Sequence, residues 1–373
     1  MTILRKGLKM KMRLKAVLVI IAVGLLLASF AFGQSRREIS FPDILDYKTL
    51  KCDFHIHTVF SDGLVWPTVR VDEAWREGLD AISITDHIEY QPHKADVPTN
   101  HNRPYELVAT KAKEKNILLI KGAEITRDTP PGHFNAIFVT DIPALDVKDF
   151  NDAVRIAYEQ GAFVFWNHPG WKPDATGWLD IHTKLYENKW LRGIEVVNGG
   201  TYYSDAHKWA NEKNLTIMGD SDVHSPITGY EDSEDPELTH RPVTLVFAKE
   251  RTVESLKEAL LEGRTAVWNK DQLIGTSKYL EAIFNASIKI GKPYHKTKDT
   301  AWFEIKNISD IDIDMARAEK AGPLKILLPA KAVINLKLKV DDKKEEVKLA
   351  YTVKNFLIAP DKGLPVTLVL PLE

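Results

Sequence analysis

Short apolar runs alternate with amphipathic segments from residue 50 to about residue 270. We predict strands at 50–56, 81–85, 117–125, 133–139, 162–169, 193–199, 215–224 and 242–248. We predict helices between them at 67–79, 104–116, 147–160, 203–214 and 252–263. Repeated strand–helix alternation over this length is typical of a parallel α/β sheet, either open or closed into a barrel. In both forms, functional groups gather at the carboxyl ends of the strands.

Histidines and carboxylates follow nearly every one of these predicted strands. His55 and His57 lie two residues apart, so a strand would place both on one face. This pair alone fits two half-buried core histidines as well as two metal ligands. The rest of the series decides between these interpretations, because scattered core histidines would not gather at one end of most strands. The other members are Asp62, Asp86, His87, Glu124, His133, His168, Asp222 and His224. Imidazoles and carboxylates together favour Zn, Fe or Mn.

The ordered series resembles the PHP family, named for polymerase and histidinol phosphatase and related to the metal-dependent amidohydrolases. The matching motifs are H-x-H, a nearby Asp, T-D-H, G-x-E, H, H-P and D-x-H. Here they stand as His55/His57, Asp62, His87, Glu124, His133, His168 and Asp222/His224. The resemblance implies a distorted seven-stranded (β/α) barrel over residues 50–272. Asp220, which precedes the last motif, is a small departure that fits either a partner of a ligand or a surface residue.

The resemblance also implies a cluster of two to three divalent metal ions. His55, His57, Glu124 and Asp222 would hold one metal, and Glu124 would bridge to a second held by His133 and His168. The third would lie on Asp62, His87 and His224. Clustered metals make hydroxide available at neutral pH and clamp phosphoryl oxygens, which suits hydrolysis of a phosphate ester.

Three residues in or beside the predicted metal cluster are candidate catalytic groups. Asp222 is a candidate proton acceptor, and His224 is a candidate donor to the leaving alcohol. Asp86 would orient an imidazole or a water, or else simply cap its strand. Arg127 and Lys172 are candidate phosphate-binding cations, with solvated loop charges as the alternative.

We therefore predict a metal-dependent phosphoesterase acting on a small phosphorylated substrate. The alternatives are a PHP-type phosphodiesterase or nuclease and, from another class, a non-catalytic metal-binding module. Residues 1–33 hold six basic and no acidic residues, which leaves 44 basic and 52 acidic residues, a formal net charge of −8, in the remaining chain. This acidic balance disfavours nucleic acid as a partner, because nucleic-acid binders need a basic surface.

The N-terminus has the pattern of an export signal. A basic segment precedes the apolar run 16–33, and small residues, Ala31 and Gly33, stand before a predicted cleavage at Gln34. The alternative is an uncleaved membrane anchor. We predict an exported, periplasmic or secreted protein, with a polar lead-in at 34–49. Cys52 is the only cysteine, so no disulfide can form within the chain, and we interpret it as a core residue.

The strand–helix alternation ends near residue 273. Short alternating apolar stretches and the charged, turn-like segment 339–348 predict a small β-sandwich-like domain over residues 273–373, entered by a short helix. It holds one histidine, His295, and no ligand-like cluster. We predict a packing or interaction role for this domain, including homo-oligomer formation.

Overall fold

The computed structural model describes residues 35–97, 100–172, 177–229, 239–341 and 343–373. The predicted export signal at 1–33 lies outside these residues. Within them, no helix combines the length and the apolar character that a membrane span requires. The chain divides into two units, Met1–Arg37 and Glu38–Glu373, and all the predicted metal ligands lie in the second unit.

Residues 48–275, the first part of the second unit, contain every strand and helix predicted between residues 50 and 263. Its strands are β1 (Lys48–Asp53), β2 (Ala81–Ile84), β3 (Leu118–Ile125), β4 (Phe134–Ile137), β5 (Phe163–Trp166), β6 (Gly193–Asn198), β7 (Thr201–Tyr202), β8 (Thr216–Asp220), β9 (Val243–Ala248), β10 (Thr265–Asn269) and β11 (Gln272–Gly275). Its helices are α2 (Pro67–Arg76), α3 (Arg103–Glu114), η1 (Pro143–Leu145), α4 (Phe150–Glu159), α5 (Asp180–Glu187), α6 (Ser204–Lys213) and α7 (Val253–Leu261). The prediction missed α5, η1, β7, β10 and β11.

The sheet is mixed, which corrects the prediction of a parallel sheet. Strands β1, β2 and β3 run parallel, as do β5, β6 and β8. In contrast, β4 is antiparallel to both β3 and β5, and β9 is antiparallel to β1 and β10. Only residues 126–133 connect β3 to β4, and a parallel pair needs a crossover of a dozen or more residues. The short connection therefore enforces the antiparallel pair.

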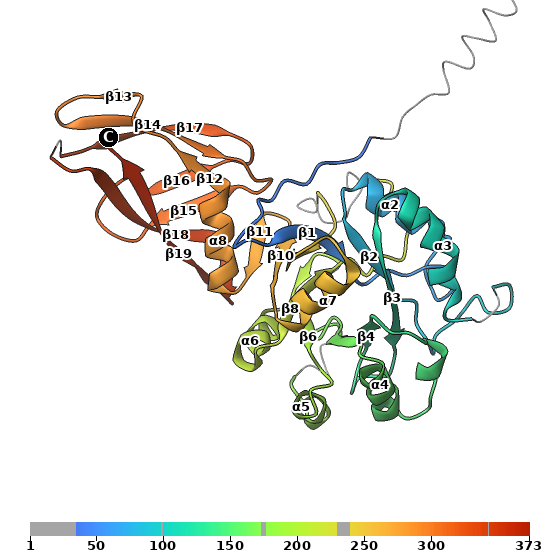
Figure 1. Ribbon diagram of the computed structural model, residues 1–373. Helices are drawn as coiled ribbons and strands as arrows, with labels where there is room; N and C mark the ends of the chain where they lie inside the picture. The colour runs from blue at the N-terminus through green and yellow to red at the C-terminus, as the bar shows by residue number, and fades with distance from the viewer. Residues whose placement is uncertain (1–34, 98–99, 173–176, 230–238, 342) are drawn as a thin grey trace, which may run out of the picture. The chain divides into compact units, whose positions relative to one another are not determined.

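The central strands are covered on both faces. Every residue of β2, β4, β5, β8, β9 and β10 is buried. Helices α2, α3, α4, α5 and α6 lie around the outside of these strands (Figure 1). Past the ends of β1 and β8, Ile56 and Val223 form a parallel bridge. This bridge brings the segment after β1 beside the segment after β8, which is where most predicted ligands lie.

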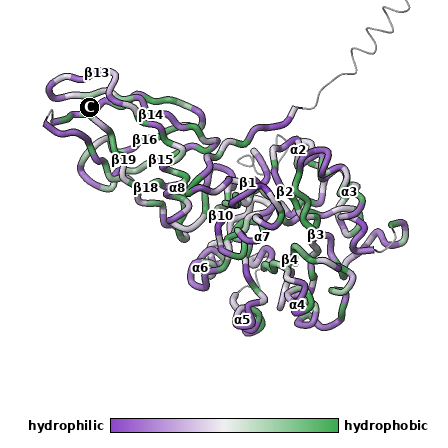
Figure 2. The backbone as a smooth tube through the Cα atoms, viewed as in Figure 1, coloured by the Kyte–Doolittle hydropathy of each residue, from purple (hydrophilic) through white to green (hydrophobic). Residues whose placement is uncertain are grey.

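The C-terminal part is β-rich, as predicted. It begins with α8 (Ser277–Ser287) and contains β12 (Ile288–Ile290), β13 (His295–Lys296), β14 (Thr300–Asn307), β15 (Ile313–Arg317), β16 (Lys325–Leu328), β17 (Val333–Lys339), β18 (Glu346–Ala359) and β19 (Lys362–Pro371). Buried and exposed residues alternate along β14, β17 and β19, and Figure 2 shows both hydropathy colours along these strands. Strand β18 also pairs in parallel with β11, so one sheet of this part continues the sheet of the first part.

Candidate metal centre

Glu124, near the end of β3, lies at the centre of the predicted ligands. It is fully buried, with no exposed surface. Its carboxylate oxygens lie 2.9–3.7 Å from ring nitrogens of five histidines, namely His55, His57, His87, His133 and His168. These histidines follow β1, β2 and β5 or precede β4. The structure therefore brings together side chains from four strands around one carboxylate.

Asp222 provides a second carboxylate to the same histidines. Its Oδ1 lies 3.0 Å from Nε2 of His57 and 3.2 Å from Nε2 of His55. Its backbone nitrogen donates to the carbonyl of His55, which ties the segment after β8 to the segment after β1. Asp222 and His168 both have positive φ angles, +51° and +30°. Such conformations are costly for residues other than glycine and gather at functional sites.

Asp62 forms a third corner of the cluster. Its oxygens lie 3.2 Å from Nε2 of His224, 3.5 Å from Nε2 of His87 and 3.7 Å from Nδ1 of His57. Nδ1 of His224 lies 2.7 Å from the backbone carbonyl of Asp222, so this nitrogen carries the proton and donates it. The other nitrogen of His224, Nε2, then has the lone pair and lies beside Asp62, so both side chains can act as ligands of one metal.

The nine predicted ligands form four overlapping groups whose candidate ligand atoms lie within 4.8 Å of one another. Three buried atoms of the cluster make no well-aligned hydrogen bond within the described residues, although each lies 3.0–3.2 Å from a carboxylate or an imidazole: Nε2 of His57, Oδ1 of Asp62 and Nδ1 of His133. Unpaired buried polar atoms are costly unless another partner satisfies them. Divalent metal ions held by different groups of the cluster would satisfy these atoms, and the mixture of imidazoles and carboxylates fits such ions.

The electrostatics of the cluster couple its acids to its bases. Burial lowers the pKa of His87, but Glu124 and Asp62 outweigh burial and raise this pKa to about 10. Burial likewise opposes a charged His55, yet Asp222, Glu195 and Glu124 raise its pKa well above the usual value. Burial raises the pKa of Glu124, but His87 and His55 hold it well below its usual range. The carboxylates thus stabilise positive charge at this point of the fold.

Asp86 lies behind the cluster rather than in it. Its carboxylate accepts hydrogen bonds from the backbone and hydroxyl of Thr58 and from the hydroxyl of Ser61, each at 2.7 Å. The Ser61 oxygen in turn lies 3.3 Å from Nδ1 of His57. Asp86 therefore holds the loop that carries His57 and Asp62. These contacts fit the predicted role of orienting an imidazole, and a catalytic role for Asp86 stays a prediction.

The sequence interpretation missed Glu195, which lies inside β6 and is fully buried. Its Oε1 accepts from Nδ1 of His55 at 2.8 Å, and its Oε2 accepts from the backbone nitrogen of His168 at 2.7 Å. Asn198 also donates to Oε2, at 2.8 Å. One carboxylate thus orients two predicted ligands from different strands. The sequence pattern that could have indicated this role is a charged residue in the middle of an apolar strand.

Arg70, on α2, is a second residue that the sequence interpretation missed. It is fully buried and donates to the carbonyl oxygens of His57, Val223, His224 and Ser225, and its guanidinium pairs with Glu73. It therefore clamps the two ligand-bearing segments together through their backbones.

Asp220 is buried as well, and its Oδ1 accepts from the backbone nitrogen of Phe54 at 2.8 Å, which excludes the surface interpretation of that residue.

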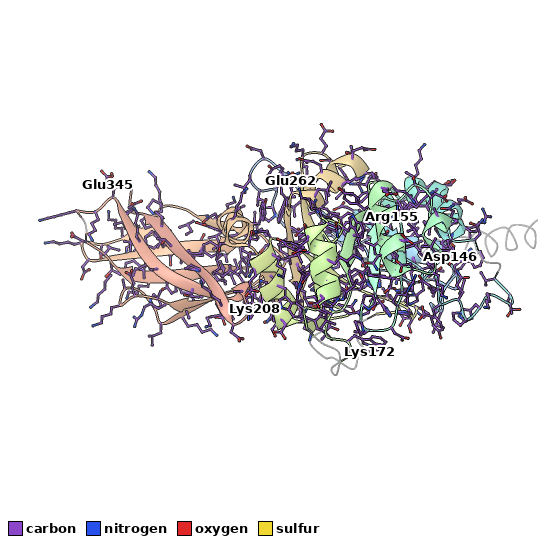
Figure 3. The ribbon with its side chains drawn as sticks, turned by 90° about the horizontal axis from the view of Figure 1, so that it is seen from below. Asp146, Arg155, Lys172, Lys208, Glu262 and Glu345 are labelled. Atoms are coloured by element: carbon purple, nitrogen blue, oxygen red, sulfur yellow. The ribbon has the colours of Figure 1, made fainter. Side chains whose placement is uncertain are left out.

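The cluster opens into a cavity of about 1050 Å³. Arg127 lines this cavity, but its guanidinium is engaged by the Glu89 carboxylate and by the carbonyl oxygens of Thr126 and Val147. Lys172 also lines it, 41% exposed and 3.7 Å from a fully exposed Asp128. Figure 3 labels Lys172. Of the two predicted cations, Lys172 is therefore the one available to a ligand.

Comparisons with known proteins agree with this fold, an α/β part that carries a candidate metal centre and an added β-domain. A crystal structure of a two-domain protein from Bacteroides vulgatus, containing a predicted PHP-like metal-dependent phosphoesterase, matches 91% of this chain and 100% of its own, at 44% identity and a TM-score of 0.85. The chain therefore belongs to the PHP-like metal-dependent phosphoesterase family. A family model described as an Ig-like domain matches residues 288–369.

More distant solved structures match parts of this chain. A candidate metal-dependent phosphoesterase from Bifidobacterium adolescentis covers 57% of this chain and 96% of its own at 16% identity, with a TM-score of 0.38. A lesion-specific endonuclease from Pyrococcus furiosus covers 67% of this chain and 64% of its own at 15% identity, with a TM-score of 0.36. No functionally curated protein matches the chain.

Proposed function

We propose that this protein hydrolyses a small-molecule phosphate ester with two to three divalent metal ions, Zn, Fe or Mn. The observation that carries the proposal is the cluster of nine donor residues beside a cavity of about 1050 Å³, a volume that accepts a small organic substrate. Family membership supports a hydrolase. The cavity wall within the described residues has three basic and three acidic side chains outside the cluster, which suits a compact substrate better than a long polyanion.

The residues that would hold the metals are the nine donors, with Glu124 shared because it touches five of the histidines. Bound divalent ions would supply a nucleophile at neutral pH and neutralise the charge on the phosphoryl oxygens. The chain itself contributes orientation: Glu195 fixes His55, and Ser61, held by Asp86, fixes His57. Lys172 reaches the cavity and would meet the phosphate or a neighbouring polar group.

The contacts support Asp222 as a proton acceptor better than they support His224 as a proton donor. Asp222 lines the cavity; its Oδ1 lies 3.0 Å from Nε2 of His57, whereas its Oδ2 lies 3.9 Å from Nε2 of His168. Oδ2 is therefore the oxygen that would accept a proton from the attacking water. His224 also lines the cavity, but both of its ring nitrogens have partners, the carbonyl of Asp222 and the carboxylate of Asp62. These contacts favour His224 as a ligand, and its role as proton donor stays a prediction.

The decisive experiment combines elemental analysis of protein purified without added metal with assays of p-nitrophenyl phosphate and its bis ester. We expect two to three equivalents of metal and faster hydrolysis of the monoester. Faster hydrolysis of the bis ester would favour a phosphodiesterase. Metal without either activity would contradict the phosphoesterase proposal, and absence of metal together with absence of metal-stimulated activity would contradict the metal centre itself.

Three further proposals concern the protein outside the site. We propose that the strands close as a distorted (β/α)7 barrel, supported by the bridge between Ile56 and Val223.

We propose export through residues 1–33, which N-terminal sequencing of the mature protein would test, with a start at Gln34 as the expected result. We propose that the C-terminal domain mediates packing or homo-oligomer formation, which light scattering of the full chain would test.

A further inference from the structure

Trp171 is an exposed aromatic side chain inside the cavity of the proposed metal centre. It is 55% exposed, although the tryptophan ring is mostly apolar, and it lines the same cavity as the ligands. Its ring centroid lies 5.5 Å from that of His133 and 5.6 Å from that of His168. An apolar ring left open to solvent beside a reaction centre has a surface that a substrate can cover.

The position of Trp171 is fixed relative to the ligands by a tight turn. Its backbone nitrogen donates to the carbonyl of His168 at 3.0 Å, and Pro169 and Gly170 form the middle of that turn. The turn is packed against Tyr203, because a Cβ on Gly170 would lie 2.6 Å from the Tyr203 ring. The turn therefore holds the backbone of Trp171 next to the ligand His168, and its ring centroid lies 5.6 Å from that of His168. A platform whose backbone is placed in advance loses less freedom when a ligand binds.

The charges around the cavity indicate which kind of ligand this platform would bind. Arg127 is neutralised by Glu89, and Asp128 lies near Lys172, so the wall has little net positive charge beyond the metal ligands. The ammonium of Lys172 lies 5.2 Å from the centroid of the Trp171 ring. An aromatic surface with one cation at its side suits an uncharged ring attached to a single phosphate group.

We propose that the alcohol portion of the substrate carries a ring that stacks on Trp171 while the phosphate lies at the metal centre. This inference rests on the proposed phosphoesterase function and narrows its substrate class to ring-bearing monophosphate esters. Tyr90, which is 53% exposed and whose ring lies 6.0 Å from that of His87, is a second aromatic side chain in the same cavity. Trp171 remains the main platform, because the turn ties it to a ligand.

Two non-hydrolysable phosphonates test this inference by binding alone. Benzylphosphonate and ethylphosphonate share one headgroup, and only the first has a ring. We expect the zinc-loaded protein to bind benzylphosphonate about 2- to 10-fold more tightly in calorimetry, the range expected for aromatic stacking. W171A should remove this preference without changing the affinity for ethylphosphonate, and W171F should restore most of it.

A control variant and the remaining outcomes keep the inference separate from the proposed function. Tyr158, on α4, is 43% exposed and does not line the cavity, so Y158A should leave both affinities unchanged. Equal affinity of the wild-type protein for the two phosphonates would overturn the stacking inference alone. A preference that survives in W171A would also overturn it. Binding of neither compound to the metal-loaded protein would overturn the proposed function, and this inference with it.

Discussion

The two parts of this protein bury their strands in different ways. In the first part, strands such as β5 and β8 are buried along their whole length. In the C-terminal part, strands such as β14 and β19 bury every second residue. A strand covered on both faces has room for polar side chains mainly at its ends, whereas a strand with one solvent face spreads them along its length. The metal-ligand groups found among the described residues all lie in the first part.

This contrast explains why the metal centre could be predicted from the sequence. Eight of the nine donors stand at or soon after the ends of apolar runs, and such runs end together at one edge of a sheet. His133 instead precedes β4, whose antiparallel direction brings its start to that same edge. Glu195 and Arg70 were not predicted because each lies within an element, one in an apolar strand and one on an amphipathic helix. Their roles depend on contacts with His55, His168 and the backbone near residue 223, which no local pattern encodes.

The fold was predicted less completely than the site. The strand–helix alternation predicted the elements, but strand direction depends on connections and neighbours rather than on periodicity. Strands β10 and β11 were missed because they lie beyond the last strand–helix repeat, between α7 and α8. Their pairing with β9 and β18 joins the two parts, and such long-range pairing is invisible to local pattern analysis.

The largest effect should come from removing the charge at the centre of the first part. Glu124→Gln keeps the size of the side chain but withdraws a carboxylate from five histidines. We expect loss of bound metal and a fall in phosphatase activity of about 1000-fold or more, because the metals supply several kcal/mol of charge stabilisation. Metal analysis and steady-state kinetics would measure it. Glu346→Gln, on β18, is the control, and full activity in Glu124→Gln would contradict the assignment.

The next effect concerns stability in the C-terminal part. Phe356 on β18 is fully buried and pairs with Leu273 of β11. Phe356→Ala should lower the free energy of unfolding by about 3–5 kcal/mol, the usual cost of such a cavity. Urea denaturation would measure this, and metal content and kcat should be unchanged while the variant is folded. Loss of metal from the folded variant would show that the C-terminal part also supports metal binding, and would contradict its assignment to stability alone.

A smaller effect should follow from weakening the support of the ligands. Glu195→Gln retains an acceptor for His55 but loses the negative charge that two ligands share. We expect metal affinity to fall by about 10- to 100-fold, the range for partners of metal ligands. Competition with a chelator of known affinity would measure it, and circular dichroism would verify the fold. An unchanged affinity would limit Glu195 to a packing role.

The last effect is a graded dependence of metal affinity on pH, which is small for each pH unit, about tenfold at most, because one proton is displaced. Without metal, burial lowers the pKa of His87, but Glu124 and Asp62 outweigh burial and raise it to about 10, so this imidazole is protonated at neutral pH. Metal binding must displace that proton, and apparent affinity should therefore rise as pH increases from about 6.5 towards 10. The same interaction stabilises the metal-free fold below about pH 6.5 and is lost as pH rises through about 10.

Titration of metal-free protein with zinc in weakly buffered solution would measure the protons released. We expect release at about pH 7, and a metal affinity that is flat between about pH 6.5 and 9 would contradict the raised pKa of His87. A His295→Gln variant is the control, because His295 lies in the C-terminal part, outside the ligand groups, and its loss should leave proton release unchanged.

The clamp formed by Arg70 has a consequence for the order of events during synthesis. The arginine and His57 come early in the chain, whereas the carbonyl oxygens of residues 223–225 come late. Seven of the nine donors, from His55 to His168, leave the ribosome before Asp222 and His224. The nascent chain therefore carries an open, incomplete set of donors until residue 225 is made. The candidate groups that include Asp222 or His224 can therefore form only late, after this part of the chain has been made.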